Sequence, residues 1–427
     1  MNIESDAGRR ALWGWSLYDF ANSAFTTLVV TFIYSAYFTR GIATDVVSGT
    51  TYWSRAMAIS SITVALLSPA LGAIADGCGC RRRFLAGTTA LCVIATVGLY
   101  FPGPGQVVLA LTWFVIANVC FELGGVFYNA FLPHLVSIDR VGRLSGIGWA
   151  VGYVGGLLCM GLAMVGFVNT ETPWLGFVTD GEHIRAVNLL VAAWFAIFSL
   201  PFFLWVREPK SNSSTRSPGA AARAAFGELA DTITHIRRYR QIARLLLARL
   251  LYNDGMVTVF AFGGIYATGT LGFTLKDLMV FGLVLNVAAG IGAFAFGFLD
   301  DRLGGKRTIQ ISVAGLVLAS LAAVTTVDIQ IFWAAAIGIG LLSGPAQAAS
   351  RSLMARFIPH GKESEFFGLY AFSGKATAFI GPLLLGILTD VFDSQRVGMS
   401  VVVALLIAGG LVLIGVDEDE GRRTGRD

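Results

Sequence analysis

Charged residues are scarce in this sequence, and their scarcity excludes an ordinary soluble protein. Only 14% of the residues are charged, whereas about 25% are charged in soluble globular domains. Hydrophobic residues make up 55% of the chain, and the mean hydropathy is +0.69. Hydrophobic runs recur along the whole length, and a run of about 18 residues or more can cross a membrane as a helix. Because the runs are continuous and do not alternate, they predict helices rather than barrel strands.

Cysteine is also scarce. The five cysteines are an odd number and all lie in the first half of the chain, at Cys78, Cys80, Cys92, Cys120 and Cys159. Such a set does not predict a disulfide framework. The pair Cys78 and Cys80 is spaced like metal ligands but lacks the second pair of a zinc site, so no metal centre is predicted.

Motifs of enzymes and nucleotide-binding proteins are missing. The sequence has no G-x-x-x-x-G-K-[ST] loop, no G-x-S-x-G nucleophile elbow and no H-E-x-x-H zinc motif. The histidines fall in loop or linker positions, at His134, His183, His235 and His360. We therefore expect neither an enzyme nor a cofactor, and a gradient must supply the energy for any activity. Basic residues are scattered between apolar segments, so no nucleic-acid partner is expected.

Apolar segments long enough to be transmembrane helices form two sets of six, separated by a polar stretch. This predicts an all-α polytopic membrane protein of twelve transmembrane helices. We expect a six-helix bundle at 1–206, a cytoplasmic linker at 207–241, a second six-helix bundle at 242–416 and a cytoplasmic tail at 417–427. The predicted helices cover 14–37, 54–76, 84–101, 107–131, 144–167, 187–206, 242–268, 277–299, 308–326, 329–350, 366–391 and 397–416.

Lysine and arginine in the loops predict the orientation of the chain, because cytoplasmic loops are enriched in these residues. The loops of one side hold only Arg40, Arg55, Arg185, Lys276 and Arg396, and nearly all the others lie on the side of both termini. We therefore expect an integral protein of the cell membrane with both termini in the cytoplasm. Its expected surroundings are the lipid bilayer, and we expect a monomer.

One loop motif occurs twice, after the second and the eighth predicted helices. Its residues are Gly72, Asp76, Gly79 and Arg81 in the first copy, and Gly297, Asp301, Arg302, Gly304 and Lys306 in the second. A carboxylate at the C-terminal end of a helix needs a cation or another helix's N-terminus nearby, and glycine permits helices to approach closely. The alternative is a simple cytoplasmic turn with basic residues, and two copies at equivalent positions make it the weaker explanation. The repeat predicts two parallel-related bundles, a transporter architecture with the substrate site between them.

The repeated motif resembles the conserved loop motif of the major facilitator superfamily, and the second copy is the closer match. The first copy departs from it, since Gly77 stands where the family usually has a basic residue. The resemblance implies the major facilitator fold. It also implies a latch that stabilises one access state through a carboxylate and basic residues, a role that falls to Asp76, Arg81, Asp301 and Arg302.

Further motifs resemble the UMF1 branch of the superfamily, which is similar to the fungal vacuolar Atg22 amino-acid effluxers. They occupy residues 15–24, 127–133, 251–255, 344–352 and 366–375. This resemblance implies transport, with amino acids as one candidate substrate class.

Ionisable residues inside the predicted membrane segments are the candidate site. A charged side chain at the bilayer centre costs about 3 kcal/mol or more, so each is a functional candidate. The ionisable residues are Asp19, Glu122, Arg249, Asp254 and Lys375, and the candidate polar residues that accompany them are Asn22, Asn118, Asn129, Asn253 and Gln347. In the resembled fold, the first, fourth, seventh and tenth helices line the central cavity.

Each candidate also has a structural alternative. Asp19 is either a solute or proton site or a carboxylate paired with a neighbouring helix. Glu122 and Asp254 are candidates for reversible protonation, because apolar surroundings favour the neutral form. Lys375 would bind a solute carboxylate or neutralise one of these acids, and Arg249 is expected to extend towards the nearer membrane surface. The amides would otherwise form hydrogen bonds between helices.

These features predict secondary active transport of a small solute by alternating access. We expect coupling to protons and a solute such as an amino acid or a similar zwitterion. Three alternatives remain open. An efflux pump for hydrophobic drugs would show broad and weak selectivity, a sensor would bind a solute without moving it, and a membrane-embedded enzyme would need a catalytic constellation that the sequence does not show.

Overall fold

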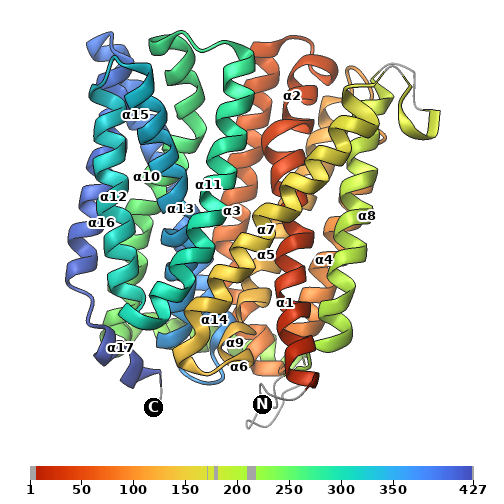
Figure 1. Cartoon of the computed structure of the whole chain (residues 1–427). Coiled ribbons are helices and arrows are strands. Elements are labelled where there is room, and N and C mark those ends of the chain that lie inside the picture. The colour runs from red at the N-terminus through yellow and green to blue at the C-terminus, as the bar shows by residue number, and fades with distance from the viewer. Residues whose placement is uncertain (1–5, 171, 177–180, 209–217, 426–427) are drawn as a thin grey trace. The chain divides into compact units, whose positions relative to one another are not determined.

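A computed structural model describes residues 6–170, 172–176, 181–208 and 218–425. Apart from their connections, these residues are helical (Figure 1). Within the described residues, ten helical segments are long and apolar enough to be candidate membrane spans. The other two predicted segments, 14–37 and 84–101, are also helical over most of their length. The described chain is an all-helical, multi-pass membrane protein, and the count of twelve spans stays a prediction.

The chain divides into two compact units. Unit 1 comprises Met1–Leu67, Gly79–Tyr128 and Val151–Lys210. In it, α8 packs against α1 and α4. Its elements are α1 (Asp6–Ala24), η1 (Phe25–Phe32), α2 (Tyr34–Tyr37), η2 (Phe38–Ile42), most of α3 (Val46–Cys78), α4 (Arg81–Gly98), nearly all of α5 (Val107–Asn129), the later part of α7 (Val141–Ala163), η4 (Met164–Val168), η5 (Trp174–Gly176) and α8 (Glu182–Trp205).

Unit 2 comprises Ser68–Cys78, Asn129–Ala150 and Ser211–Asp427. It therefore combines the ends of α3 and α5 and the start of α7 with the second half of the chain. In it, α10 packs against α16, while α11 and α12 pack against α13. Its further elements are α6 (Leu132–Leu135), η3 (Ile138–Arg140), α9 (Pro218–Thr234), η6 (Ile236–Tyr239), α10 (Arg240–Leu271), α11 (Leu275–Leu303), α12 (Gly305–Thr325), α13 (Ile329–Phe357), α14 (Glu363–Lys375), α15 (Ile380–Phe392), α16 (Gln395–Ile414) and α17 (Glu418–Thr424).

The first membrane segment is not a regular helix. After Asp19 and Asn22, α1 passes into the π-helical turns of η1 at Phe25. Such turns are rare and occur frequently at functional sites. The preceding part of α1 is held by an aromatic core, in which the fully buried Trp15 stacks on Tyr128 at 4.7 Å between ring centroids. The polar face of α1 therefore lies between a rigid aromatic anchor and an irregular stretch of backbone.

The prediction of one continuous helix at 366–391 was wrong. α14 ends at Lys375 and α15 begins at Ile380. In a continuous helix, the Gly374 carbonyl would accept a hydrogen bond from the amide of residue 378, and the Gly381 amide would donate to the carbonyl of residue 377. Here the Gly374 carbonyl accepts from Asn253 and the Gly381 amide donates to Asp254. Side chains of α10 thus take the partners that would have completed the helix.

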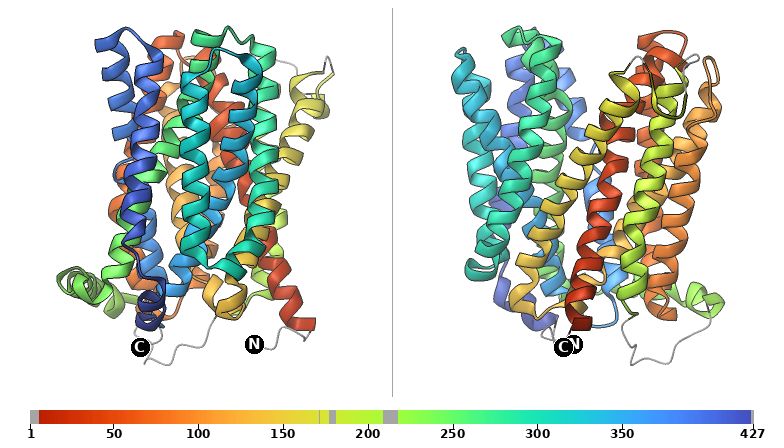
Figure 2. Two further views of the ribbon diagram at one scale, coloured as in Figure 1. Left: turned by 60° about the vertical axis from the view of Figure 1, so that its left-hand side comes forward. Right: turned by 45° about the vertical axis from the view of Figure 1, so that its right-hand side comes forward.

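The linker and the tail both contain helices. In the linker, α9 ends near the buried Thr232, whose hydroxyl lies 2.5 Å from Glu365 at the start of α14. Figure 2 shows α9 at the same end of unit 2 as the tail helix α17. The serine-rich part of the predicted linker, at 209–217, lies outside the described residues. The domain boundaries inferred from the sequence therefore stay predictions.

Two cysteines depart from the expectation drawn from their number. Cys78 and Cys80 are disulfide-bonded, whereas Cys92, Cys120 and Cys159 are buried free thiols. An odd number of cysteines argues against a framework of disulfides between distant segments, but it does not exclude one local disulfide between two cysteines beside the same turn.

Candidate functional site

The first copy of the loop motif docks onto the N-terminus of α14. The two carboxylate oxygens of Asp76 accept hydrogen bonds from the backbone amides of Ser364 at 3.1 Å and Glu365 at 2.9 Å. One turn earlier, a Cβ atom on Gly72 would fall 2.2 Å from the Ser364 carbonyl oxygen, so only glycine permits this approach. The buried charge of Asp76 faces the positive end of the α14 dipole. We call Gly72, Asp76, Ser364 and Glu365 the first latch.

The second copy docks onto the N-terminus of α7 in the same way. Asp301 accepts a hydrogen bond from the Arg143 backbone amide at 3.1 Å, and the Arg143 Nε atom lies 3.6 Å from its other oxygen. A Cβ atom on Gly146 would fall 2.7 Å from the Cα of Gly297. In both copies, the motif carboxylate binds a first-turn amide and the motif glycine touches the same helix. Gly146, Gly297, Arg143 and Asp301 form the second latch.

The second copy also holds a buried ion pair that the sequence did not predict. Arg356 of α13 donates from Nη1 to Asp300 at 2.6 Å, and its Nη2 lies 3.7 Å from Asp301. Arg302 is exposed and forms no ion pair with any residue that the structure describes. The acidic pair Asp300 and Asp301 lies on α11, and its basic partner is Arg356 of α13, not Arg302. The spacing of the motif could not reveal it because Arg356 is distant along the chain from Asp300 and Asp301.

Acidic residues after α8 and α16 repeat the same arrangement. Glu208 accepts hydrogen bonds from the amides of Arg81 at 3.1 Å and Arg82 at 2.7 Å, at the start of α4. Glu418 accepts from the Lys306 amide at 3.0 Å, at the start of α12. Burial raises the pKa of Glu208, while the amide bond from Arg82 opposes that shift. The motif residues Arg81 and Lys306 thus lie in the first turns of helices α4 and α12, whose positive ends bind a carboxylate.

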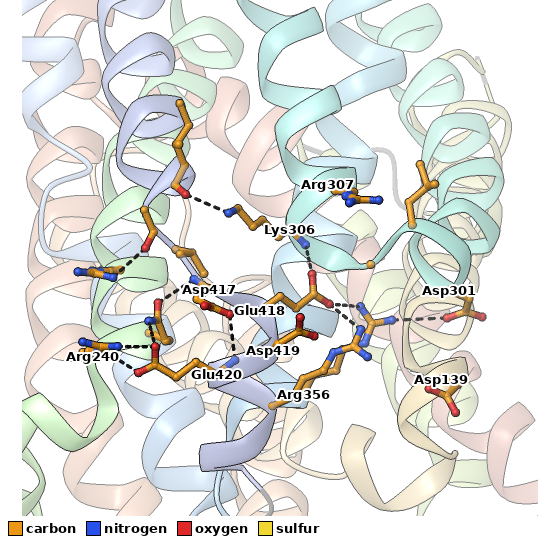
Figure 3. A pocket seen from close by; sticks show the side chains of 18 of the residues that line it. Asp139, Arg240, Asp301, Lys306, Arg307, Arg356, Asp417, Glu418, Asp419 and Glu420 are labelled. Carbon is orange, nitrogen blue, oxygen red and sulfur yellow. Dashed lines mark hydrogen bonds and ion pairs between the residues drawn. The ribbon is translucent and has the colours of Figure 1, made fainter.

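A charged cavity of about 730 Å³ lies beside the second latch, and Figure 3 shows its side chains. Arg356 and the tail residues Glu418 and Glu420 line it. The hydrogen bond from Arg240, at 2.5 Å, lowers the pKa of Glu420 to about 2. None of the predicted solute-binding residues lines this cavity. We therefore assign it to the latch and the tail rather than to the solute.

Within unit 1, the structure places four of the predicted solute residues on two helices. Asp19 and Asn22 are half-buried on α1, where Ser23 donates a hydrogen bond to the Asp19 carbonyl at 2.8 Å. Asn118 is buried and Glu122 is half-buried, one turn apart on α5. Both pairs keep the helical spacing that the sequence predicts. Their roles stay predictions.

Within unit 2, four more predicted residues gather at the break between α14 and α15. Gln347 donates to Asn253 at 2.9 Å, and Asn253 donates to the Gly374 carbonyl at 3.4 Å. Asp254 follows Asn253 on α10, and Lys375 is the half-buried last residue of α14. The break therefore collects polar groups from α10, α13 and α14 deep within a membrane segment.

Asn129 belongs to a different contact. Its side-chain oxygen lies 3.4 Å from Nη1 of Arg351, which also donates to the Ser145 hydroxyl at 2.9 Å and to the Ser145 carbonyl at 2.7 Å. Arg351 is only 4% exposed. Arg351 was not among the candidate residues of the sequence analysis. Arg351 joins α13 to the end of α5 and the start of α7.

The expectation that Arg249 extends to the membrane surface was wrong. Arg249 is 8% exposed, and its guanidinium lies 3.6 Å from the Tyr370 ring centroid. Its Nη1 donates to the Tyr370 carbonyl at 2.8 Å and to the Ser373 hydroxyl at 3.1 Å. Space for it exists because Gly374 has no side chain, since a Cβ there would fall 2.7 Å from Nη1. No acidic residue in the described ranges pairs with it.

The sequence matches one family model, and the match covers nearly the whole chain. The family is described as vacuole effluxer Atg22 like, and the matched residues are 7–143 and 137–426. An uncharacterized MFS-type transporter of Bacillus subtilis, YxiO, is 28% identical over 95% of this chain and 94% of its own length. Autophagy-related protein 22 of Yarrowia lipolytica is 25% identical over 66% of this chain. That alignment spans only 51% of the fungal protein.

The fold also matches solved structures. The human organic anion transporter MFSD10 (TETRAN) has a TM-score of 0.75 at 13% identity, with 95% of this chain and 99% of that protein covered. An identity this low shows the fold alone. The fold is that of the major facilitator superfamily, as in other solved members that the chain resembles.

Proposed function

Because the chain belongs to the Atg22-like vacuole effluxer family of major facilitator transporters, we propose that it moves a small solute by alternating access as a secondary active transporter. The observation that carries this proposal is the pair of latches. Each latch joins a motif carboxylate and a motif glycine to the first turn of another helix without a covalent bond. Contacts of this kind can open and close as a unit, as alternation between two access states requires.

The solute in this proposal is an amino acid or a similar zwitterion. Lys375 supplies a cation for a solute carboxylate, while Asp19, Glu122 and Asp254 supply acidic groups. One or more of these acids couples solute movement to protons. The partners of the protein are then the solute and the coupling proton, and its surroundings are the lipid bilayer. We further propose a monomer in the cell membrane with both termini in the cytoplasm, from the distribution of lysine and arginine in the loops.

Transport assays in liposomes test the proposal. Purified protein is reconstituted, and labelled alanine, leucine, lysine and glutamate are the probes. We expect saturable counterflow of at least one probe and its accumulation under a pH gradient. Replacement of the coupling acid, tested as Asp19→Asn, Glu122→Gln and Asp254→Asn, should abolish accumulation and leave counterflow intact.

The exposed Asp390 of α15 provides the matched control, because Asp390→Asn removes a carboxylate outside the proposed site. If all three variants kept both counterflow and accumulation under a pH gradient, proton coupling through these acids would be contradicted. A probe that stabilises the protein against heat but is not moved would identify a sensor instead. Weak movement of many hydrophobic drugs would identify an efflux pump.

A further inference from the structure

The break between α14 and α15 lies within the candidate membrane span Glu363–Phe392. Residues 376–379 form turns, with the Ile380 amide bonded to the Thr377 carbonyl at 2.8 Å. A broken helix inside a bilayer leaves backbone groups that must find partners within the protein. Its two new ends also carry opposite partial charges, negative at the end of α14 and positive at the start of α15.

Side chains of α10 match both partial charges. Arg249 donates to the Tyr370 carbonyl, in the last turns of α14. Asn253 donates to the Gly374 carbonyl. At the other end, Asp254 accepts from the Gly381 amide at 3.0 Å, in the first turn of α15. A cation thus lies at the negative end and a carboxylate at the positive end, so α10 stabilises the broken form of the segment.

The close approach of α15 to α10 depends on Gly381. A Cβ atom there would fall 2.1 Å from the Thr258 hydroxyl and 3.1 Å from Oδ1 of Asp254. Thr258 itself donates to the Asp254 backbone carbonyl at 2.7 Å, so its hydroxyl does not serve the carboxylate. The start of α15 therefore touches the Asp254 side chain directly.

The Asp254 carboxylate is only half satisfied. Asp254 is 2% exposed, and its Oδ1 atom is buried without a hydrogen-bond partner. It also forms no ion pair with a described residue. The charged side chains on the packed elements α13, α14, α15 and α16 are Arg351, Arg356, Glu363, Glu365, Lys375, Asp390 and Arg396, and Arg249 is the nearest on α10 itself. A carboxylate buried in this way has an open position for a proton.

We propose that Asp254 is the group that takes up the coupling proton, and that its protonation releases the start of α15. The ionised carboxylate holds the Gly381 amide and faces the positive end of α15. A proton from the aqueous phase binds Oδ1 and removes the charge, so the attraction to the helix end is lost and the hydrogen bond weakens. Loss of the proton to the aqueous phase restores the anchored state. This rests on the proposed function and assigns the coupling role to one of its three acids.

In this proposal, protonation of Asp254 affects transport by changing the backbone next to Lys375. Lys375 is the last residue of α14, so it directly precedes the turns that separate α14 from Ile380 at the start of α15. Release of α15 changes the backbone that follows Lys375, while Arg249 and Asn253 keep the end of α14 in place. Arg249 is in this scheme a positioning residue.

Hydrogen exchange of the purified full-length protein in lipid discs tests the proposal. The readout is the protection of the amides at 376–381 and at Leu383, corrected for the intrinsic effect of pH on exchange; Pro382 has no amide hydrogen. In the wild type, we expect protection to fall about tenfold between about pH 8 and about pH 5. Asp254→Asn mimics the protonated form, so its protection should be low at both pH values. Asp254→Glu, which keeps an ionisable group, should retain a pH response.

Asp390→Asn is the control and should behave like the wild type, because Asp390 is an exposed carboxylate on α15, the helix whose start is released in the proposal. Unchanged protection in unit 1 would show that Asp254→Asn is folded. The proposal would be overturned if amide protection at the break did not change with pH in the wild type, or if the full pH response persisted in Asp254→Asn. Proton-driven flux in Asp254→Asn would also overturn it and leave the proposed function standing. A normal exchange response in a protein that moves no solute would overturn the proposed function alone.

Discussion

Two carboxylates hold the two halves of the broken segment, and they do so differently. Asp76 uses each oxygen for one backbone amide at the start of α14. Asp254 uses one oxygen for the Gly381 amide at the start of α15 and leaves the other without a hydrogen bond. The same device, a carboxylate at a helix N-terminus, is thus more fully satisfied in the latch than at the break. Protonation of Asp76 would weaken its hydrogen bonds to two amides, whereas Asp254 has an oxygen that accepts no hydrogen bond and can take the proton.

The largest effect is expected where the carboxylate is satisfied. Asp76→Ala removes both acceptors and leaves the amides of Ser364 and Glu365 without them. We expect a loss of about 3 kcal/mol in the free energy of unfolding, because each lost bond involves a charged acceptor. Unfolding of the protein in lipid discs measures this loss. Asp390→Ala, the exposed control, should cost less than about 0.5 kcal/mol. Equal losses in the two variants would show that the amide bonds do not hold the latch.

Gly72 tests the close approach at the same latch. A Cβ atom there would meet the Ser364 carbonyl oxygen, a backbone atom that cannot rotate away. We therefore expect Gly72→Ala to cost about 2 kcal/mol in unfolding free energy through overpacking. Gly87 on α4 is the control, since no atom lies within 4 Å of a Cβ built there. A Gly72→Ala protein as stable as Gly87→Ala would argue against close contact at the latch.

Arg249 extends the comparison to the negative end of the break. Arg249→Lys keeps the charge but loses the planar group that lies over Tyr370 and donates to its carbonyl. We expect a smaller loss of about 1 kcal/mol in unfolding free energy. Protection of the amides at the end of α14 should fall in hydrogen exchange, while the pH response at 376–383 persists. If Arg249→Lys abolished that response, Arg249 would belong to the proton site itself.

Glu420, a half-buried residue of the tail helix α17, gives a reference outside the membrane segments and the smallest expected effect. Its pKa is lowered from 4.5 to about 2, mainly by the hydrogen bond from Arg240. A lowered pKa means that its contribution to stability is present above about pH 4.5 and is lost as the pH falls towards 2. Hydrogen exchange at 418–424 should therefore accelerate only in that acidic range. Glu420→Gln should remove the transition, and an acceleration near neutral pH would contradict this assignment.

Several parts of the site follow from sequence reasoning, and others do not. The loop motif predicted that Asp76 and Asp301 need a helix N-terminus or a cation and that the motif glycines permit close packing. Both copies have these contacts. The motif did not reveal Arg356, because a buried partner from a distant helix leaves no mark in the spacing of the motif.

The break in the eleventh segment shows why the rest was hidden. Residues 366–391 read as one apolar run, but Pro382, which has no amide hydrogen and is favoured in the first turn of a helix, stands directly after the break. Pro382 favours a helix boundary locally, but the sequence of the segment does not show that Asn253 and Asp254, far away in the chain, take the hydrogen bonds of Gly374 and Gly381. Local preference cannot report a competition with a side chain from another helix.

By itself, the sequence determined that this is a multi-pass helical membrane protein with a repeated latch motif. The apolar runs are long enough to span the hydrocarbon core of a bilayer as helices. The motif repeat is visible directly in the sequence. Only the tertiary structure decided which helix each motif carboxylate binds, which side chains hold the two ends of the broken eleventh segment and how Arg249 is buried. These outcomes depend on distances between residues far apart in sequence, and in a membrane every buried polar group must take whichever partner the packing brings within reach.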